Sequence, residues 1–148
     1  MANKPNNPNC PCSGGDGEDV TKGVGNTGEF VLSGAGKNNF IYADLNKNGS
    51  IDFAIEAGEG ASIRGSELFK SMMSHYGNNV KGVAGNWSYG TNLAKVNELT
   101  AANRMSLQSA ISKTWTGNQA AKYGFTSARI TEAVGSPGNY TKISTIFE

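Results

Sequence analysis

Two runs of alternating side chains, joined by an Asn-Gly turn, constrain the fold more than any other feature of this sequence. The runs are residues 40–45 (FIYADL) and 51–56 (IDFAIE), and residues 46–50 separate them. Asn48-Gly49 supplies the positive φ values that a tight turn between antiparallel strands needs. The sequence therefore predicts a β-hairpin, and with it a sheet that is at least partly antiparallel.

The same turn has a second possible interpretation, a calcium-binding loop. The residues with nearly the spacing of an EF-hand loop are Asp44, Asn46, Asn48, Gly49 and Asp52. The pattern fails at its twelfth position, which is Ile55 instead of a bidentate glutamate. Since the surrounding alternation also predicts strands rather than helices, we favour the plain hairpin and expect no metal site. The sequence leaves open whether the Asp44–Asp52 segment binds calcium.

An apolar stripe at helical spacing follows the hairpin. Its members are Leu68, Phe69, Met72, Met73 and Tyr76. Gly77 predicts a left-handed helix end, and Asn78-Asn79 predict a turn. We expect a short buried strand over residues 80–84 and then a loop rich in Trp, Tyr and Asn over residues 86–92.

The other elements complete an α+β fold. We expect a strand over residues 29–32, a helix over 93–102 capped by Thr91 or Asn92, a helix capped by Ser106, and a short helix capped by Thr116 that ends near Gly124. A second hairpin is predicted from residues 125–134 and 140–147. The predicted architecture is a mainly antiparallel sheet of two hairpins plus a short central strand, with three to four helices.

Length and composition indicate one domain with a leading tail. A chain of 148 residues suggests a single core. Residues 1–28 are rich in Pro, Gly and Asn, so we interpret them as a flexible tail or linker and residues 29–148 as a single α+β domain. Cys10 and Cys12 fall in that tail and predict neither a disulfide nor a zinc site. No run is long and apolar enough to span a membrane, and no signal-peptide pattern is present.

Charge is distributed unevenly along the chain. Residues 1–60 carry four Lys and eight Asp or Glu, whereas residues 61–148 carry nine Lys or Arg and four Glu. A basic second half is compatible with a phosphate-bearing substrate. Scattered basic residues are also typical of solvated faces, so the pattern does not require such a substrate.

The predicted helix carries the candidate catalytic residues. At 100° per residue, Arg64, Ser71 and His75 fall within a narrow arc on one flank of the apolar stripe, and Glu67 lies beside them. An arginine, a carboxylate and an imidazole could bind an anion and move a proton, with Ser71 as a substrate contact. The alternative is a solvated flank with a weak Arg64–Glu67 pair.

Further candidate substrate contacts lie in two loops. Trp87, Tyr89 and Asn92 could form a ligand rim between a strand and a helix, and Thr116 lies in a T-W-T-G segment. The structural alternatives are that Trp87 fills the edge of the core and that Trp115 fills a corner between two helices.

Short segments along residues 40–147 resemble a known family. They are G-N-W (85–87), T-N-L (91–93), Ser106, T-W-T-G (114–117), A-A-K-Y-G-F (120–125) and G-S-P-G-N-Y-T (135–141). Together they resemble the C-terminal toxin domains of bacterial Rhs/YD-repeat and related polymorphic toxins. The resemblance implies secretion or delivery by a larger carrier protein upstream, action in the cytoplasm of a competing cell, and a cognate immunity protein.

The resemblance does not supply the reaction. The H-x-E and P-C-x-x-C elements of a zinc deaminase are absent, and the single histidine disfavours an HNH nuclease. The favoured function is a metal-independent ribonuclease without a cofactor, in which His75 and Glu67 exchange protons and Arg64 holds the phosphate.

Two alternatives remain open. One is an ADP-ribosyltransferase that uses NAD, with Arg64 on the pyrophosphate and Trp87 or Tyr89 against the nicotinamide. Its late glutamate would have to be Glu132 or Glu148, and neither lies in a Q/E-x-E pattern. The other is a non-enzymatic binding module, because Asn, Gly and exposed aromatic residues also suit a recognition surface.

Overall fold

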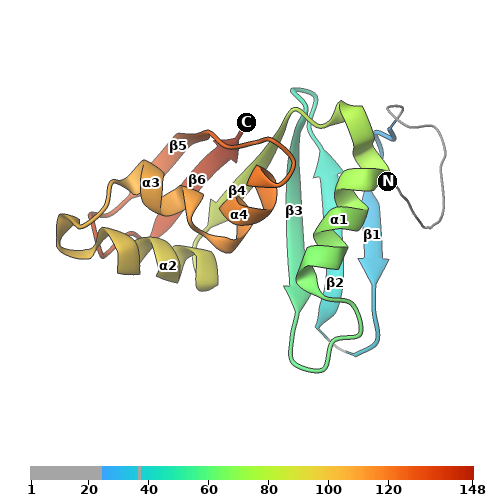
Figure 1. The fold of residues 1–148 in the computed structure, drawn as a ribbon, viewed down its shortest axis with the longest axis horizontal. Coiled ribbons are helices and arrows are strands. Elements are labelled where there is room, and N and C mark those ends of the chain that lie inside the picture. The colour runs from blue at the N-terminus through green and yellow to red at the C-terminus, as the bar shows by residue number, and fades with distance from the viewer. Residues whose placement is uncertain (1–24, 37) are drawn as a thin grey trace.

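The computed structural model describes residues 25–36 and 38–148, and its strands form one six-stranded sheet (Figure 1). The spatial order of the strands is β1-β2-β3-β4-β6-β5. The strands are β1 (Phe30–Ser33), β2 (Asn39–Leu45), β3 (Ser50–Ala57), β4 (Gly82–Trp87), β5 (Ala128–Val134) and β6 (Lys142–Phe147). The helices are α1 (Gly65–Tyr76), α2 (Thr91–Thr100), α3 (Leu107–Ser112) and α4 (Trp115–Ala121), with 3₁₀ turns at Gly77–Asn79 and Ala101–Asn103.

All pairings within this sheet are antiparallel except the one between β3 and β4. A parallel pair needs a crossover connection, and α1 provides it. The predicted α+β class is therefore confirmed, with two differences in the strand arrangement. β1 extends the first hairpin to three strands, and β4 joins that unit to the β5–β6 hairpin.

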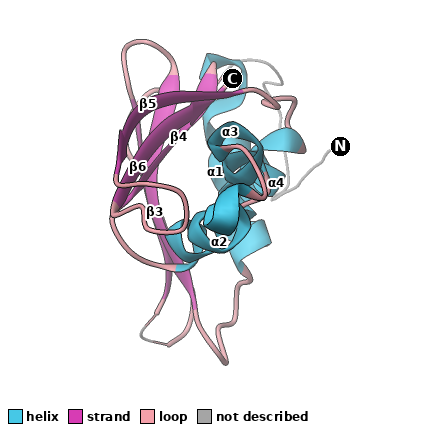
Figure 2. Cartoon of the chain, turned by 90° about the vertical axis from the view of Figure 1, so that its left-hand side faces the viewer, coloured by secondary structure: helices cyan, strands magenta, loops and turns pink. Residues whose placement is uncertain are grey.

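The four helices cover one face of the sheet, and the core lies between them and the strands (Figure 2). The predicted stripe on α1 is confirmed, because all five of its side chains are buried. Fully burying an apolar side chain of this size contributes about 1.5–3 kcal/mol. The phenol of Tyr76 also finds a partner, since its hydroxyl donates to the Ala43 carbonyl at 3.1 Å.

The predicted Asn-Gly turn is confirmed between β2 and β3. Gly49 has φ of +91°, and its N–H donates to the Asn46 carbonyl at 2.9 Å. The Asn48 side-chain oxygen accepts from the Ser50 N–H at 3.0 Å, and the Asn46 amide donates to Asp52 at 2.8 Å. Two of the residues that resemble calcium ligands in the sequence, Asn48 and Asp52, thus accept hydrogen bonds from within the hairpin.

Two predicted helix caps are wrong for one shared reason. Thr114, not Thr116, caps α4 by accepting from the Gly117 N–H at 3.1 Å. At α2 the N-cap is Gly90, not Thr91 or Asn92. The Asn92 amide donates instead to the Thr116 hydroxyl at 3.0 Å. Both side chains that were expected to cap helices therefore form a hydrogen bond between α2 and α4.

Neither tryptophan lies in the loop that the sequence predicts for it. Trp87 ends β4, where it is 8% exposed and its ring centroid lies 6.5 Å from that of Phe147. Its alternative role, filling the edge of the core, is the one observed. Trp115 is 37% exposed and packs edge-on against Phe69 with centroids 6.0 Å apart, so it lies at the boundary of the core.

Of the predicted tail, only residues 25–28 belong to the described part; residues 1–24, with both cysteines, lie outside it. Asn26 contacts the end of α1, because its backbone N–H and side-chain amide both donate to the His75 carbonyl at 3.0 Å. The Asn79 amide donates to the Asn26 carbonyl at 2.9 Å. Among the described helices, none has the length and apolar character needed to cross a membrane.

Candidate functional site

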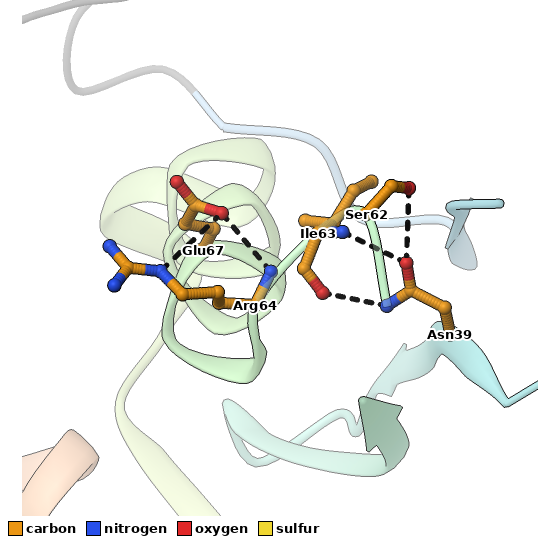
Figure 3. Close-up of polar contacts among 5 residues, drawn as sticks. All are labelled: Asn39, Ser62, Ile63, Arg64 and Glu67. Atoms are coloured by element: carbon orange, nitrogen blue, oxygen red, sulfur yellow. Dashed lines mark hydrogen bonds and ion pairs between the residues drawn. The ribbon is translucent and has the colours of Figure 1, made fainter. Parts of the chain in front are cut away.

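Arg64 and Glu67 lie together at the start of α1. Asn39, 2% exposed, fixes the preceding loop: its side-chain oxygen accepts from the Ile63 N–H at 2.9 Å, and its amide donates to the Ile63 carbonyl at 2.7 Å (Figure 3). The Arg64 N–H then donates to Glu67 Oε1 at 3.1 Å, which caps the helix. The Arg64 Nε–Glu67 Oε1 distance is 4.0 Å, and both side chains are exposed, at 81% and 54%.

This exposed pair is available for chemistry. An ion pair so open to water contributes only about 0.2–1 kcal/mol, so the Arg64 guanidinium can leave Glu67 for a ligand while the helix cap still holds the carboxylate. Within the described residues, Glu67 Oε2 has no hydrogen-bond partner. The pair can therefore offer one carboxylate oxygen and a guanidinium to a ligand.

His75 lies on the same helix but not beside that pair. At a rise of about 1.5 Å per residue, eight residues separate Glu67 from His75 by roughly 12 Å along the axis. Ser71, half-buried, lies between them. The structure thus brings Arg64 and Glu67 together and leaves His75 out of reach of both.

The imidazole of His75 is also covered. Its ring centroid lies 4.7 Å from that of Phe30 and 4.8 Å from that of Tyr76. Its Nε2 atom is buried and has no hydrogen-bond partner among the described residues. This burial lowers the pKa of His75, because the charged form loses solvation.

The four candidate substrate contacts in the two predicted loops differ in how exposed their side chains are. Thr116 is 2% exposed and is joined to Asn92, whose side-chain oxygen also accepts from the Thr116 N–H at 3.4 Å. Trp87 belongs to the core, whereas Tyr89 is 86% exposed three residues before Asn92. Of these four predicted contacts, Tyr89 alone presents most of its side chain to a ligand.

Sequence reasoning missed a pocket at the other end of α1. It has a volume of about 480 Å³ and lies between the end of α1 and the connection from α4 to β5. Its lining residues are Met73, Ser74, Gly77, Asn78, Val80, Lys81, Tyr123 and Phe125. The signal available in the sequence was the helical spacing of Lys70 and Ser74, which puts both on one face of α1, with Gly77 directly after the end of the helix.

One lysine lines this pocket and two more lie close to its lining residues along the chain, so we call it the lysine-rimmed pocket. Lys81 lines it, Lys70 lies one helical turn before the lining residues Met73 and Ser74, and Lys122 directly precedes Tyr123. All three lysines are exposed, and within residues 25–36 and 38–148 none has a carboxylate within 4.0 Å. These lysines therefore give the region positive charge that no ion pair among the described residues offsets.

Tyr123 gives the pocket a proton donor. Its ring centroid lies 5.8 Å from that of Phe69, and burial raises its pKa to about 12. The phenol therefore keeps its proton at neutral pH and can donate to a phosphate or a base. No three His, Cys, Asp or Glu side chains of the described segments gather in a group that could hold a metal ion.

Comparisons with known proteins found no relative of this chain. No protein-family model matches the chain, and no curated protein or solved structure is significantly similar to it. What the site can do must therefore be argued from its own geometry and charge.

Proposed function

We propose that this chain is an antibacterial effector domain, delivered by a larger carrier, that binds and cleaves RNA in the cytoplasm of a target cell. The resemblance to polymorphic toxin domains motivates the biological setting. The lysine-rimmed pocket is the observation that carries the choice of RNA, because Lys81 and two aromatic rings line it and two further exposed lysines neighbour its lining residues in the chain. Phosphates and bases are the groups that such a surface binds.

The outer face of α1 links this pocket to the Arg64–Glu67 pair. Ser74, Lys70 and Glu67 recur at spacings of four and three residues, so they form one exposed row along the helix. The row from Ser74 to Glu67 is roughly 10 Å long at the helical rise per residue. A single strand held in the pocket can reach the pair within a few nucleotides.

The pair suits cleavage by the RNA's own 2′-hydroxyl. Glu67 Oε2 takes the hydroxyl proton while the 2′-oxygen attacks the adjacent phosphorus, and the Arg64 guanidinium stabilises the charge that develops on the phosphate oxygens. The products are a 2′,3′-cyclic phosphate and a free 5′-hydroxyl, whose proton comes from solvent. His75 takes no part, because its Nε2 atom is buried.

The test is cleavage of an end-labelled single-stranded RNA by the purified protein. Glu67→Gln keeps a side chain that can cap α1 but removes the base, so we expect a loss of at least about 100-fold in rate. Glu98→Gln is the matched control, since Glu98 pairs with Lys95 three residues away on α2. Cleavage by Glu67→Gln at the wild-type rate would exclude this mechanism.

Expression in bacterial cytoplasm tests the wider proposal. We expect growth arrest together with discrete RNA fragments, and neither effect with Glu67→Gln. Growth arrest with intact RNA would instead favour NAD-dependent modification of a macromolecule. Harmless expression of the wild-type chain would favour a binding module.

A further inference from the structure

We infer that the lysine-rimmed pocket holds one unstacked base of a single-stranded RNA, so that the domain selects single strands over duplexes. This inference rests on the proposed function, because it names the form of RNA that the same surface accepts. It concerns recognition only and is independent of which residues cut the strand.

The walls of the pocket suit a nucleobase. A volume of about 480 Å³ lies within the range of about 300–1,000 Å³ typical of small-molecule sites. Tyr123 and Phe125 contribute aromatic rings from one side, and Met73 contributes a polarisable thioether from α1. Stacking on aromatic side chains is the usual way in which proteins hold a base that has left its strand.

The polar groups of the pocket suit the edge of a base and its phosphates. The Asn78 side chain offers both a donor and an acceptor, and Ser74 offers a hydroxyl. Lys81 lies in the lining, while Lys70 and Lys122 come from the two segments on either side. A base in the pocket therefore leaves its neighbouring phosphates within a cationic border.

A duplex cannot use these walls without losing base pairs. In A-form RNA the bases are stacked and paired, and the grooves display mainly sugar hydroxyls, base edges and phosphates. Entry into the pocket requires one base to leave the stack, which costs a few kcal/mol in a duplex and much less in a single strand. Lysine contacts alone would not produce this preference, because both forms carry phosphates.

The test compares one RNA in two forms. The probe is a short 2′-O-methylated RNA, which lacks the attacking hydroxyl and so stays intact, used alone or annealed to its complement. We expect the single strand to bind about tenfold more tightly than the duplex. Tyr123→Leu should lower the single-strand affinity about tenfold and change the duplex affinity little, whereas Tyr123→Phe keeps the ring and should bind nearly as wild type does.

A control and a parallel assay separate the possible failures. Tyr42→Leu removes a ring of similar exposure, 41% against 38% for Tyr123, from β2, outside the candidate sites, and should leave both affinities unchanged. Equal binding of the two forms, or Tyr123→Leu with wild-type affinity, would overturn the inference even if unmodified RNA is cleaved. Binding that depends on Tyr123 without any cleavage would sustain the inference and overturn the ribonuclease. An absence of RNA binding would overturn both.

Discussion

The two flanks of α1 carry similar polar residues but lie in opposite environments. On one flank, two residues cover His75: Asn26 donates to its carbonyl, and Phe30 packs against its ring. On the other flank, Lys70 and Ser74 border an open pocket. The difference shows that the angle around a helix places a residue on a flank, whereas distant segments decide whether that flank is accessible.

The largest expected effect comes from uncovering the closed flank with Phe30→Ala. Loss of this half-buried ring should cost about 2 kcal/mol of the free energy of unfolding, below the range for a fully buried Phe. The pKa of His75 should also rise towards its ordinary value as the ring gains water. Denaturant unfolding and NMR titration of the single histidine would measure both. An unchanged titration would mean that Phe30 does not provide the cover.

A smaller effect is expected when lysines are removed from the flank of α1 that borders the pocket. Lys70→Ala combined with Lys81→Ala should weaken single-stranded RNA binding about tenfold at moderate salt and leave the unfolding free energy nearly unchanged. The slope of log affinity against log salt should fall by about 1.4, or about 0.7 for each phosphate that a lysine no longer neutralises. Lys95→Ala, which removes a lysine already paired with Glu98, is the control. A loss of stability without a change in slope would contradict the assignment.

The smallest effect concerns the dependence of stability on pH. The pKa of His75 is lowered in the folded state, so between that value and the unfolded value of about 6.5 the unfolded chain binds more protons. The stabilisation is therefore fully present above about pH 6.5 and is lost as the pH falls through the folded pKa. His75→Phe keeps a ring against Phe30 and should remove this loss. Unfolding curves for both proteins at matched pH values would show it, and parallel pH profiles would contradict it.

Much of the fold follows from the sequence because its signals are local. The Asn48-Gly49 turn, the buried stripe on α1 and the Ser106 cap of α3 each depend on residues a few positions apart. The errors arise where a partner is distant in the chain. Asn92 and Thr116, 24 residues apart, bind each other instead of capping their own helices.

The candidate site was less predictable for the same reason. The spacing of residues on a helix gives their angle around the axis, but it does not show which of them are accessible. The sequence therefore groups His75 with Glu67 although the two lie far apart along the helix axis. The cover over His75 comes from residues 26–30, and one wall of the lysine-rimmed pocket comes from Tyr123 and Phe125. Neither segment carries a local signal that points to α1.

The position of β4 has a consequence for the order of folding. Its pairing with β3 is limited to Ser50 with Gly82 and Ile51 with Val83, while β6 pairs with it from Val83 to Trp87. During synthesis, the strand at the centre of the sheet therefore lacks its main hydrogen-bonding partner until residues 142–147 have been made. Until then its backbone groups are open to water or to other chains. We expect the β1–β3 unit to fold early and the complete sheet to close late, as one long-range step.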